Sequence, residues 1–525
     1  MTFGQWFIFF LIVQLVHFLG TWKLYKKAGR QPWEAAVPVY NGIILMKIIN
    51  RPWWWVVLLF IPVVNLIMFP VVWVETLRSF GLNSTKDTAL GVLTLGFYIY
   101  YVNYMMDVQH IPNRDLKPRT AAGEWTSSIL FAVVAATIVH TYFMQPYTIP
   151  TPSLEKTLLV GDFLFVSKFH YGARVPMTPV SFPMVHDTIP VVKTKSYRTW
   201  PQIPYFRLPG FQEVKKNDIV VFNWPVDTVR FFRDRSGIHV DKPIDKKSNY
   251  VKRCVATPGD SLQIIDGKIH INGTPLKLSD RAKPQTAYTV TTKGKAFDPY
   301  FLYQRYDITD SYGQFRDAAP NEFYFPSISD EAYAKFKNHP EIASITKFIN
   351  PVQPGDKGVF PNNGKRTWTI DNFGPLYIPK AGTTVNLDSN SYSLYRRIIE
   401  IYEGSEMGID NRLTTNGTQV LLNGSPISSY TFKQDYYWMM GDNRHNSEDA
   451  RAWGFVPYNH IVGKPVFIWM SWDSNAKGIM NKIRWERLFT TVGGSGKPTS
   501  YLSVFLIIVV LWFAWSFFKK RRQNA

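Results

Sequence analysis

Apolar runs that can enter a bilayer constrain this chain more than any other feature of its sequence. A helix of about 20 apolar residues crosses the hydrocarbon core of a membrane. The clearest run, at 502–518, is followed at once by four basic residues. Prolines interrupt the second run, and the third is only moderately apolar and could lie at the interface instead of crossing. Five runs are expected to be spans, at residues 6–19, 53–74, 89–104, 128–143 and 502–518.

Basic residues beside these runs predict an orientation, because Lys and Arg gather in cytoplasmic loops. The pattern predicts an outer N-terminus, five crossings, an inner C-terminus and an outer segment at 145–500. It also assigns much of the net charge of +20 to contact with lipid. Zinc-ligand spacing and the aromatic motifs of nucleic-acid modules are missing from the sequence, so no nucleic-acid partner is expected. The basic residues that set the orientation are Lys23, Lys26, Lys27, Arg30, Lys47, Arg51, Arg114, Lys117, Arg119 and Lys519 to Arg522.

The outer segment differs in composition from the apolar runs. It is rich in Pro, Gly, Tyr, Asn and Asp, with short alternating runs such as 219–222, 268–271 and 419–422. Runs of this length between turn residues are typical of β-strands, and Asp266-Gly267 predicts a type I′ hairpin turn. Two Asn-Gly hairpins, at 271–275 and 422–426, resemble each other.

We therefore expect a multi-span α-helical membrane anchor joined to a mostly-β extracytoplasmic domain. The expected domains are a multi-span region at 1–110, a transmembrane anchor at 126–144, a β domain at 145–490, a flexible linker at 491–500, a last transmembrane helix at 501–518 and a basic cytoplasmic tail at 519–525.

A serine follows the fourth run closely. Two prolines extend the backbone just before Ser153, in the sequence Pro150-Thr151-Pro152-Ser153. A hydroxyl held there would lie near the outer membrane surface. Taken alone, this serine is more simply a juxtamembrane loop residue.

A lysine lies on a predicted strand at 250–256, which ends in Pro258-Gly259-Asp260. Burial disfavours a charged ammonium and lowers its pKa, so a buried lysine can act as a base toward a serine hydroxyl. Taken alone, Lys252 is more simply a solvated residue of an edge strand. Cys254 is the single cysteine, so the chain has no internal disulfide, and a small buried residue is its simplest interpretation.

Polar and charged residues crowd the turn-rich stretch at 441–457, which also contains Ser447 and an aromatic-Gly-aromatic sequence. A solvated loop does not need this density of Asp, Asn, Arg and Trp. Ion pairs of Asp449 with Arg451 or Arg253 are expected to brace a site there.

The three stretches, in this order, resemble the bacterial type I signal peptidases, the serine–lysine family that removes signal peptides. The segment 150–158 is similar to the family's nucleophile motif, residues 218–225 to the strand motif that follows it, 250–260 to the lysine motif and 441–457 to the last motif. Thr151 stands where the family usually has serine, Leu154 where it has methionine, Lys156 where it has proline and His445 where it often has Asp. The resemblance implies a signal-peptidase-like β fold with an inserted second β domain, here at about 261–435 and larger than usual.

The resemblance also implies roles for individual residues. Ser153 is the nucleophile, Lys252 its general base, and Ser447 orients the lysine. The Thr151 hydroxyl and the Ser153 N–H form the oxyanion hole. Substrate pockets for small residues would be lined by Ile149, Leu154, Leu158, Tyr250 and Val251, and Arg253, Asp442, Asp449 and Arg451 are structural.

The function expected from the sequence is a serine endopeptidase of the bacterial inner membrane that cuts exported preproteins after small-x-small sites. No metal or cofactor is expected, since His110, His140 and His170 are isolated in the sequence. The expected partners are preproteins, membrane lipid and the secretion machinery. Two alternatives stay open: another serine–lysine peptidase, and an inactive homologue whose insertion is a binding or scaffold module.

Overall fold

The computed structural model describes residues 1–118, 120–231, 234, 236–294, 296–352, 358–417 and 419–524. They form two compact units. The first comprises Met1–Phe143, Arg174–Leu208 and Val229–Lys246, and the second comprises Met144–Ala173, Pro209–Thr228 and Lys247–Ala525. Arg119 of the expected inner loops and Ala525 of the expected tail lie outside the described residues.

The N-terminal segment of the first unit, Met1–Phe143, is built from helices. Among the described residues, three helices of the chain are long and apolar enough to cross a membrane, at Phe3–Lys27, Ala121–Phe143 and Leu502–Arg522. The first two belong to this unit, and they agree in position with the first and fourth expected spans. The helices of the unit are α1 (Phe3–Lys27), α2 (Tyr40–Ile48), α3 (Trp55–Leu58), α4 (Asn65–Ser79), α5 (Thr85–Leu93), α6 (Tyr98–Met105) and α7 (Ala121–Ile138).

The expected second span, at 53–74, is broken into α3 and α4. Val63, between the two helices, has a φ of 70°. This left-handed conformation interrupts the helix. At 1.5 Å per residue the 15 residues of α4 reach only about 22 Å. The two ends of the segment also meet, because Arg51 Nη2 lies 2.8 Å from Glu75 Oε2. The segment therefore folds back on itself, and its two ends lie next to each other.

The expected third span, at 89–104, is likewise two short helices, α5 and α6. Leu95 and Gly96 between them have φ values of 53° and 84°, which reverse the chain. The ends of this segment meet as well, since the Ile111 N–H donates to the Ser79 carbonyl oxygen at 2.9 Å. Over the described residues, the chain thus has two re-entrant hairpins where the sequence predicts two crossings, and three candidate spans instead of five.

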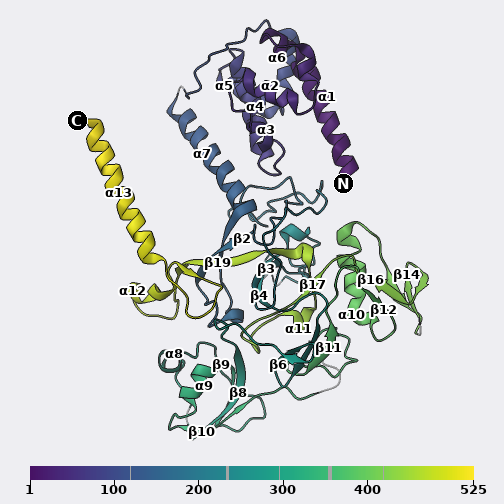
Figure 1. Ribbon diagram of the computed structural model, residues 1–525, viewed down its shortest axis with the longest axis vertical. Coiled ribbons are helices and arrows are strands. Elements are labelled where there is room, and N and C mark those ends of the chain that lie inside the picture. The colour runs from purple at the N-terminus through teal and green to yellow at the C-terminus, as the bar shows by residue number, and fades with distance from the viewer. Residues whose placement is uncertain are drawn as a thin grey trace. The chain divides into compact units, whose positions relative to one another are not determined.

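The second unit contains an eight-stranded sheet that carries the segments expected to hold the site. Its order is β1-β2-β19-β3-β4-β17-β18, with β20 beside β19, and each pairing is antiparallel. Figure 1 shows β2, β19, β3, β4 and β17 in this layer. The strands are β1 (Met144–Thr148), β2 (Asp162–Ser167), β3 (Ile219–Asn223), β4 (Asn249–Ala256), β17 (Tyr436–Met440), β18 (Val456–Pro457), β19 (Ile461–Ser471) and β20 (Thr490–Thr491).

Between the neighbouring strands β4 and β17 the chain leaves the main sheet and forms four smaller sheets. One of them packs α8 (Pro299–Tyr306) and α9 (Asp330–Phe336) over a separate aromatic core. The strands are β5 (Ser261–Ile265), β6 (Lys268–Ile271), β7 (Thr274–Pro275), β8 (Gln285–Thr292), β9 (Glu322–Ser329), β10 (Ile342–Lys347), β11 (Phe373–Tyr377), β12 (Thr384–Asn386), β13 (Leu413–Thr415), β14 (Val420–Leu422), β15 (Ser425–Ile427) and β16 (Ser429–Thr431).

The expected hairpins are confirmed. Asp266 and Gly267 have φ values of 48° and 75° and join β5 to β6, as a type I′ turn requires. The two Asn-Gly sequences join β6 to β7 and β14 to β15.

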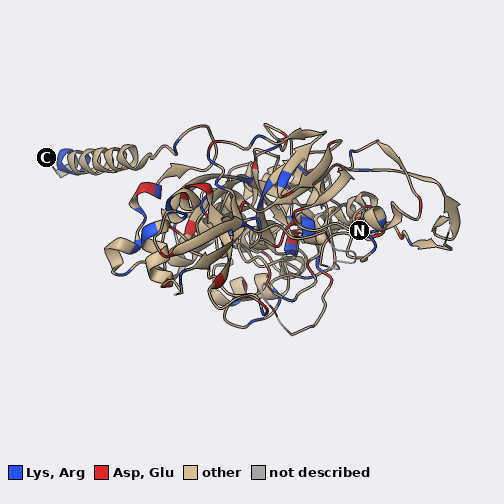
Figure 2. Cartoon of the chain, turned by 90° about the horizontal axis from the view of Figure 1, so that it is seen from below, with Lys and Arg blue, Asp and Glu red and all other residues tan. Residues whose placement is uncertain are grey.

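The last helix, α13 (Leu502–Asn524), ends in the basic residues that mark the expected tail. Figure 2 shows blue basic residues at the free end of this helix.

Candidate active site

The nucleophile segment is a short turn of helix beside the main sheet. Pro152 opens a 3-10 helix, Pro152–Leu154, and Thr151 before it is extended. Pro is favoured at the first position of a helix, where its missing N–H costs nothing. Asn443 fixes this turn from the other side: its N–H donates to the Ser153 carbonyl oxygen at 3.1 Å, and its Nδ2 donates to the Pro152 carbonyl oxygen at 3.2 Å.

The structure brings Ser153 and Lys252 together. Lys252 lies on β4, and its Nζ is 2.6 Å from Ser153 Oγ. Both residues are buried, with exposures of 6% for Ser153 and 4% for Lys252. Burial lowers the pKa of Lys252 to about 8, against the opposing effect of the Asp449 and Glu448 carboxylates. About a tenth of the amine is therefore neutral at pH 7, far more than for a lysine in water, and this form can accept the serine proton.

Two buried ion pairs support this serine–lysine pair. Arg253, next to Lys252 on β4, places its Nε 2.8 Å and its Nη2 2.6 Å from the two carboxylate oxygens of Asp442. The Thr157 hydroxyl donates to the same carboxylate at 2.6 Å, which ties the segment after the nucleophile to the last motif.

The second ion pair lies at the other end of the last motif. Asp449 accepts the Gly441 N–H at 3.0 Å and two hydrogen bonds from the Arg451 guanidinium, at 2.9 and 2.8 Å. Asp449 thus pairs with Arg451, and Arg253 pairs with Asp442 instead. All four charged side chains are buried and hydrogen-bonded, as buried charges require.

Ser447 lies near the nucleophile, but its hydroxyl makes no hydrogen bond within the part of the chain that the structure describes. A Cβ atom built on Gly441 would lie 2.2 Å from Ser447 Oγ and 2.6 Å from the Ser153 carbonyl oxygen, so these two groups flank the glycine. The role of Ser447 in orienting Lys252 stays a prediction. Thr151 is half-buried directly before the 3-10 helix, and its oxyanion role stays a prediction too.

The apolar residues expected to line the substrate pockets divide into two groups. Ile149, Leu154 and Leu158 are 3%, 1% and 1% exposed and belong to one core cluster, against which Val251 packs. Tyr250 is not in this cluster: its ring stacks on Trp224 at 4.9 Å between centroids, and Lys252 Nζ lies 5.6 Å from its centroid. The first three residues therefore offer little surface, and Tyr250 and Val251 are the more exposed of the five.

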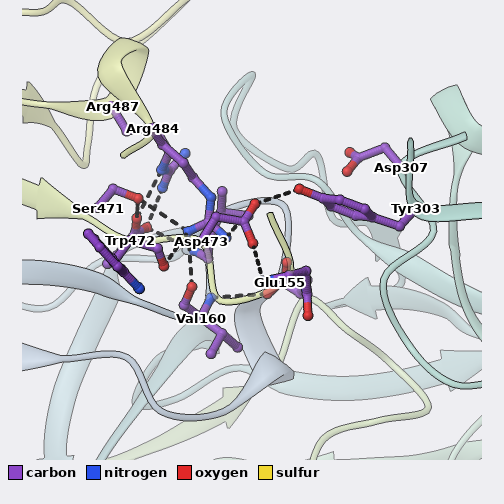
Figure 3. A network of polar contacts seen from close by, with 12 residues as sticks. Glu155, Val160, Tyr303, Asp307, Ser471, Trp472, Asp473, Arg484 and Arg487 are labelled. Carbon is purple, nitrogen blue, oxygen red and sulfur yellow. Dashed lines mark hydrogen bonds and ion pairs between the residues drawn. The ribbon is translucent and has the colours of Figure 1, made fainter. Parts of the chain in front are cut away.

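A polar network lies beside the nucleophile segment (Figure 3). Asp473 accepts a hydrogen bond from the Tyr303 hydroxyl at 2.7 Å and lies 3.4 Å from Arg484 Nη2. Glu155 accepts the Val160 N–H at 3.2 Å, and burial raises the pKa of this carboxyl. These residues line a cavity of about 440 Å³ that the sequence did not predict.

The motifs contain Gly441, Asn443 and Thr157, but the sequence alone indicates no role for these residues. Gly441 and Asn443 lie within the stretch at 441–457, so the resemblance was the signal that could have found them. Thr157 lies in the segment at 150–158, so the resemblance is a signal for it too, whereas Tyr303 carries no such signal. Their importance depends on partners 285 and 170 residues away in the chain.

A mostly-β domain joined to candidate membrane helices is the architecture of a membrane-anchored enzyme. Comparison with known families makes this specific: the profile described as "Signal peptidase, peptidase S26" matches residues 122–327 and 387–472, more than half of the chain. The chain belongs to this family. Residues 33–113, which contain both re-entrant hairpins, match a second profile, described as a family of unknown function.

Curated relatives agree with this assignment. A signal peptidase I of Buchnera aphidicola (subspecies Acyrthosiphon pisum) is 24% identical over 74% of this chain and 90% of its own length. That of Haemophilus influenzae is 23% identical over 72% of this chain and 78% of its own length. That of Helicobacter pylori is 25% identical over 71% of this chain and 93% of its own length.

Proposed function

We propose that this enzyme removes N-terminal signal peptides from exported preproteins after small-x-small sites, with Ser153 as nucleophile and Lys252 as general base. The observation that carries the proposal is the 2.6 Å contact between Lys252 Nζ and Ser153 Oγ in a buried setting. A lysine can serve as a base only where burial lowers its pKa, and burial has this effect on Lys252.

The chemistry proceeds in two halves. The neutral Lys252 amine takes the proton of Ser153 Oγ while the oxygen attacks the carbonyl carbon of the scissile peptide bond. The tetrahedral intermediate collapses, the C–N bond breaks, and the Lys252 ammonium gives its proton to the departing amine of the mature protein. A water molecule, deprotonated by Lys252, then attacks the ester carbonyl carbon; the C–O bond to Ser153 breaks, the Lys252 ammonium returns the proton to Ser153 Oγ, and the signal peptide leaves.

The oxyanion of each tetrahedral intermediate needs donors. The N–H of Ser153 is in the first turn of a 3-10 helix, where backbone N–H groups lack partners within the helix. The Thr151 hydroxyl is the second donor that we propose, and a single donor of this kind contributes roughly 3 to 4 kcal/mol to the lowering of the barrier.

The preference for small residues follows from the packing beneath the site. Ile149, Leu154 and Leu158 are buried in one core cluster and offer little surface to a substrate side chain. Large side chains next to the scissile bond would meet atoms that cannot move without opening this core.

We also propose that the second unit works on the outer side of the inner membrane. Three crossings, like five, keep the N-terminus and the segment between α7 and α13 on the same side. The basic residues at 23–30, at 78–86, at 114–117 and at 519–522 then all face the cytoplasm, as the positive-inside rule favours.

A cleavage assay tests the proposal. The full chain in detergent is incubated with a preprotein that has Ala at both small positions, and the product is followed by mass spectrometry. Ser153→Ala and Lys252→Met should each lower the cleavage rate by at least about a thousandfold, because each removes a group of one catalytic unit.

Matched controls distinguish loss of chemistry from loss of fold. Ser428→Ala and Lys268→Ala change the same residue types at exposed positions and should cleave at the rate of the unaltered enzyme. Thermal unfolding of all five proteins shows whether each is folded. Cleavage by folded Ser153→Ala or Lys252→Met at an unchanged rate would refute the pair, and an unaltered protein without activity would favour the inactive-homologue alternative.

A further inference from the structure

A hairpin of the first unit exposes several large apolar side chains. The segment at 181–197 pairs with itself through the bridges Ser181–Tyr197 and Thr188–Lys195. Its turn is closed by two hydrogen bonds: the Ile189 N–H donates to the Thr194 carbonyl oxygen at 2.9 Å, and the Lys193 N–H donates to the Ile189 carbonyl oxygen at 2.8 Å. The tip, at 190–195, is therefore a defined turn.

The tip carries apolar side chains that are exposed on the surface. Val191 is 90% exposed and Val192 is 60% exposed. Phe182 at the base of the hairpin and Trp200 just beyond it are 57% and 73% exposed. Burial of apolar surface is favourable, and a cluster of exposed apolar side chains on one projection indicates a surface that is covered in the working protein.

Hydrogen bonds place this hairpin near one end of a candidate membrane span. The Trp6 Nε1–H, at the start of α1, donates to the Gln202 carbonyl oxygen at 2.9 Å. The ammonium group of Met1 donates to the same oxygen at 3.4 Å. Tryptophan is enriched where a spanning helix leaves the hydrocarbon, because its ring is apolar and its N–H is polar. The base of the hairpin therefore lies at the level of the membrane–water interface.

The hairpin also encloses a hollow together with a helix of the same unit. A cavity of about 770 Å³ is lined by the hairpin residues Phe182 and Ile189, by Val180 directly before the hairpin, and by Leu66 at the start of α4. Its apolar walls suit an acyl chain. Tyr197, Lys195 and Arg198 lie at the same cavity and are groups that bind phosphate.

The charge of the hairpin is complementary to lipid headgroups. Lys193, Lys195 and Arg198 are exposed on and below the tip. The acidic residue of this segment, Asp187, lies 3.0 Å from Lys242 and is thereby neutralised. Basic side chains that flank exposed apolar ones are the pattern of segments that enter the headgroup region of a bilayer.

We propose that the 181–197 hairpin is a lipid-binding element, which inserts Val191 and Val192 among the acyl chains and holds headgroup phosphates with Lys193, Lys195 and Arg198. The inference goes beyond cleavage and does not depend on it. The hairpin anchors the loop between β2 and β3 to the bilayer, in addition to the spanning helices.

A fluorescence measurement on the full chain tests this proposal. Val191→Cys is labelled with the environment-sensitive dye NBD, and Cys254 does not interfere because it is fully buried. The labelled protein is reconstituted into vesicles of phosphatidylcholine and phosphatidylglycerol in equal amounts, with or without lipids that carry a quencher on the acyl chain. The matched control is Ile265→Cys, an exposed apolar residue of β5.

The expected result is a blue-shifted emission at position 191 and quenching several-fold stronger than at position 265. Lys193→Glu combined with Lys195→Glu should weaken the quenching at 191 more in these vesicles than in pure phosphatidylcholine. Quenching of the 191 label by aqueous iodide and not by the acyl-chain quencher would overturn the proposal. A blue shift that acyl-chain quenchers do not reduce would point to a protein partner and would overturn it too.

Discussion

The protonation state of Lys252 decides the rate in the proposed mechanism. The ammonium cannot accept the Ser153 proton, and burial brings the pKa of Lys252 to about 8. Because this pKa is that of a base that must be neutral, the rate falls as pH drops below it and levels off above it. We expect kcat/KM to fall about tenfold per pH unit well below pH 8. A profile of rate against pH, between about pH 5 and 9, measures this. The peptide substrate should contain no group that titrates in this range.

Removal of the Glu448 carboxylate tests whether the acid limb of this profile belongs to Lys252. This carboxylate raises the pKa of Lys252, so Glu448→Gln should move the acid limb of the profile to lower pH and increase the rate at neutral pH. Glu341→Gln removes another exposed carboxylate and should leave the profile in place. An unchanged profile in Glu448→Gln would show that the limb belongs to another group.

At the scale of structural elements, the site depends on the close approach of the last motif to the nucleophile turn. Gly441, directly after β17, has no room for a side chain: the added Cβ would lie 2.6 Å from the Ser153 carbonyl oxygen. Gly441→Ala should therefore displace the nucleophile turn. A shift of about 1 Å can cost about a hundredfold in rate. The loss should appear in kcat with a smaller change in KM.

Gly313→Ala is the matched control for this displacement. Its added Cβ would meet no atom within 4 Å, and it should retain full activity. Full activity in Gly441→Ala would mean that the 3-10 helix at Pro152–Leu154 is not held against the last motif during catalysis.

Some elements of the site can be predicted from local sequence, and others depend on distant residues. Strand β4, the type I′ turn at Asp266-Gly267 and the position of the Lys252 motif could be predicted, since local residue types determine them. The partner of Arg253 could not: Asp442 is 189 residues away, and Asp449 was an equally charged candidate. Nor could the cavity beside Glu155, because Tyr303 and Asp473 reach it from distant segments.

In the membrane region, the sequence locates the apolar segments but not the path of the chain through them. Hydropathy detects apolar segments, but it does not tell a crossing from a hairpin that turns back. Pro62 signalled a break in the second run. The hydrogen bond from Ile111 to Ser79 and the ion pair of Arg51 with Glu75, which show that both segments return, join residues that no local pattern connects.

At the scale of the whole molecule, the number of crossings decides where the loop between α4 and α5 lies. Five crossings put this loop outside, and three crossings with two re-entrant hairpins put it inside, although both place the second unit outside. Asn83 is an exposed residue of the loop. We expect Asn83→Cys in spheroplasts to resist a membrane-impermeant maleimide until the membrane is permeabilised. The buried Cys254 contributes no background.

Two reference positions complete this test. Ser428→Cys in the second unit should react from outside, and Lys520→Cys in the tail should react only after permeabilisation, since the outer position of the second unit and the inner position of the tail follow from either count. Reaction of Asn83→Cys from outside, with both references as expected, would restore five crossings and exclude the re-entrant arrangement. Protection of Ser428→Cys would instead reverse the orientation of the whole chain. It would move the proposed Ser153–Lys252 pair to the side of the membrane that exported preproteins leave.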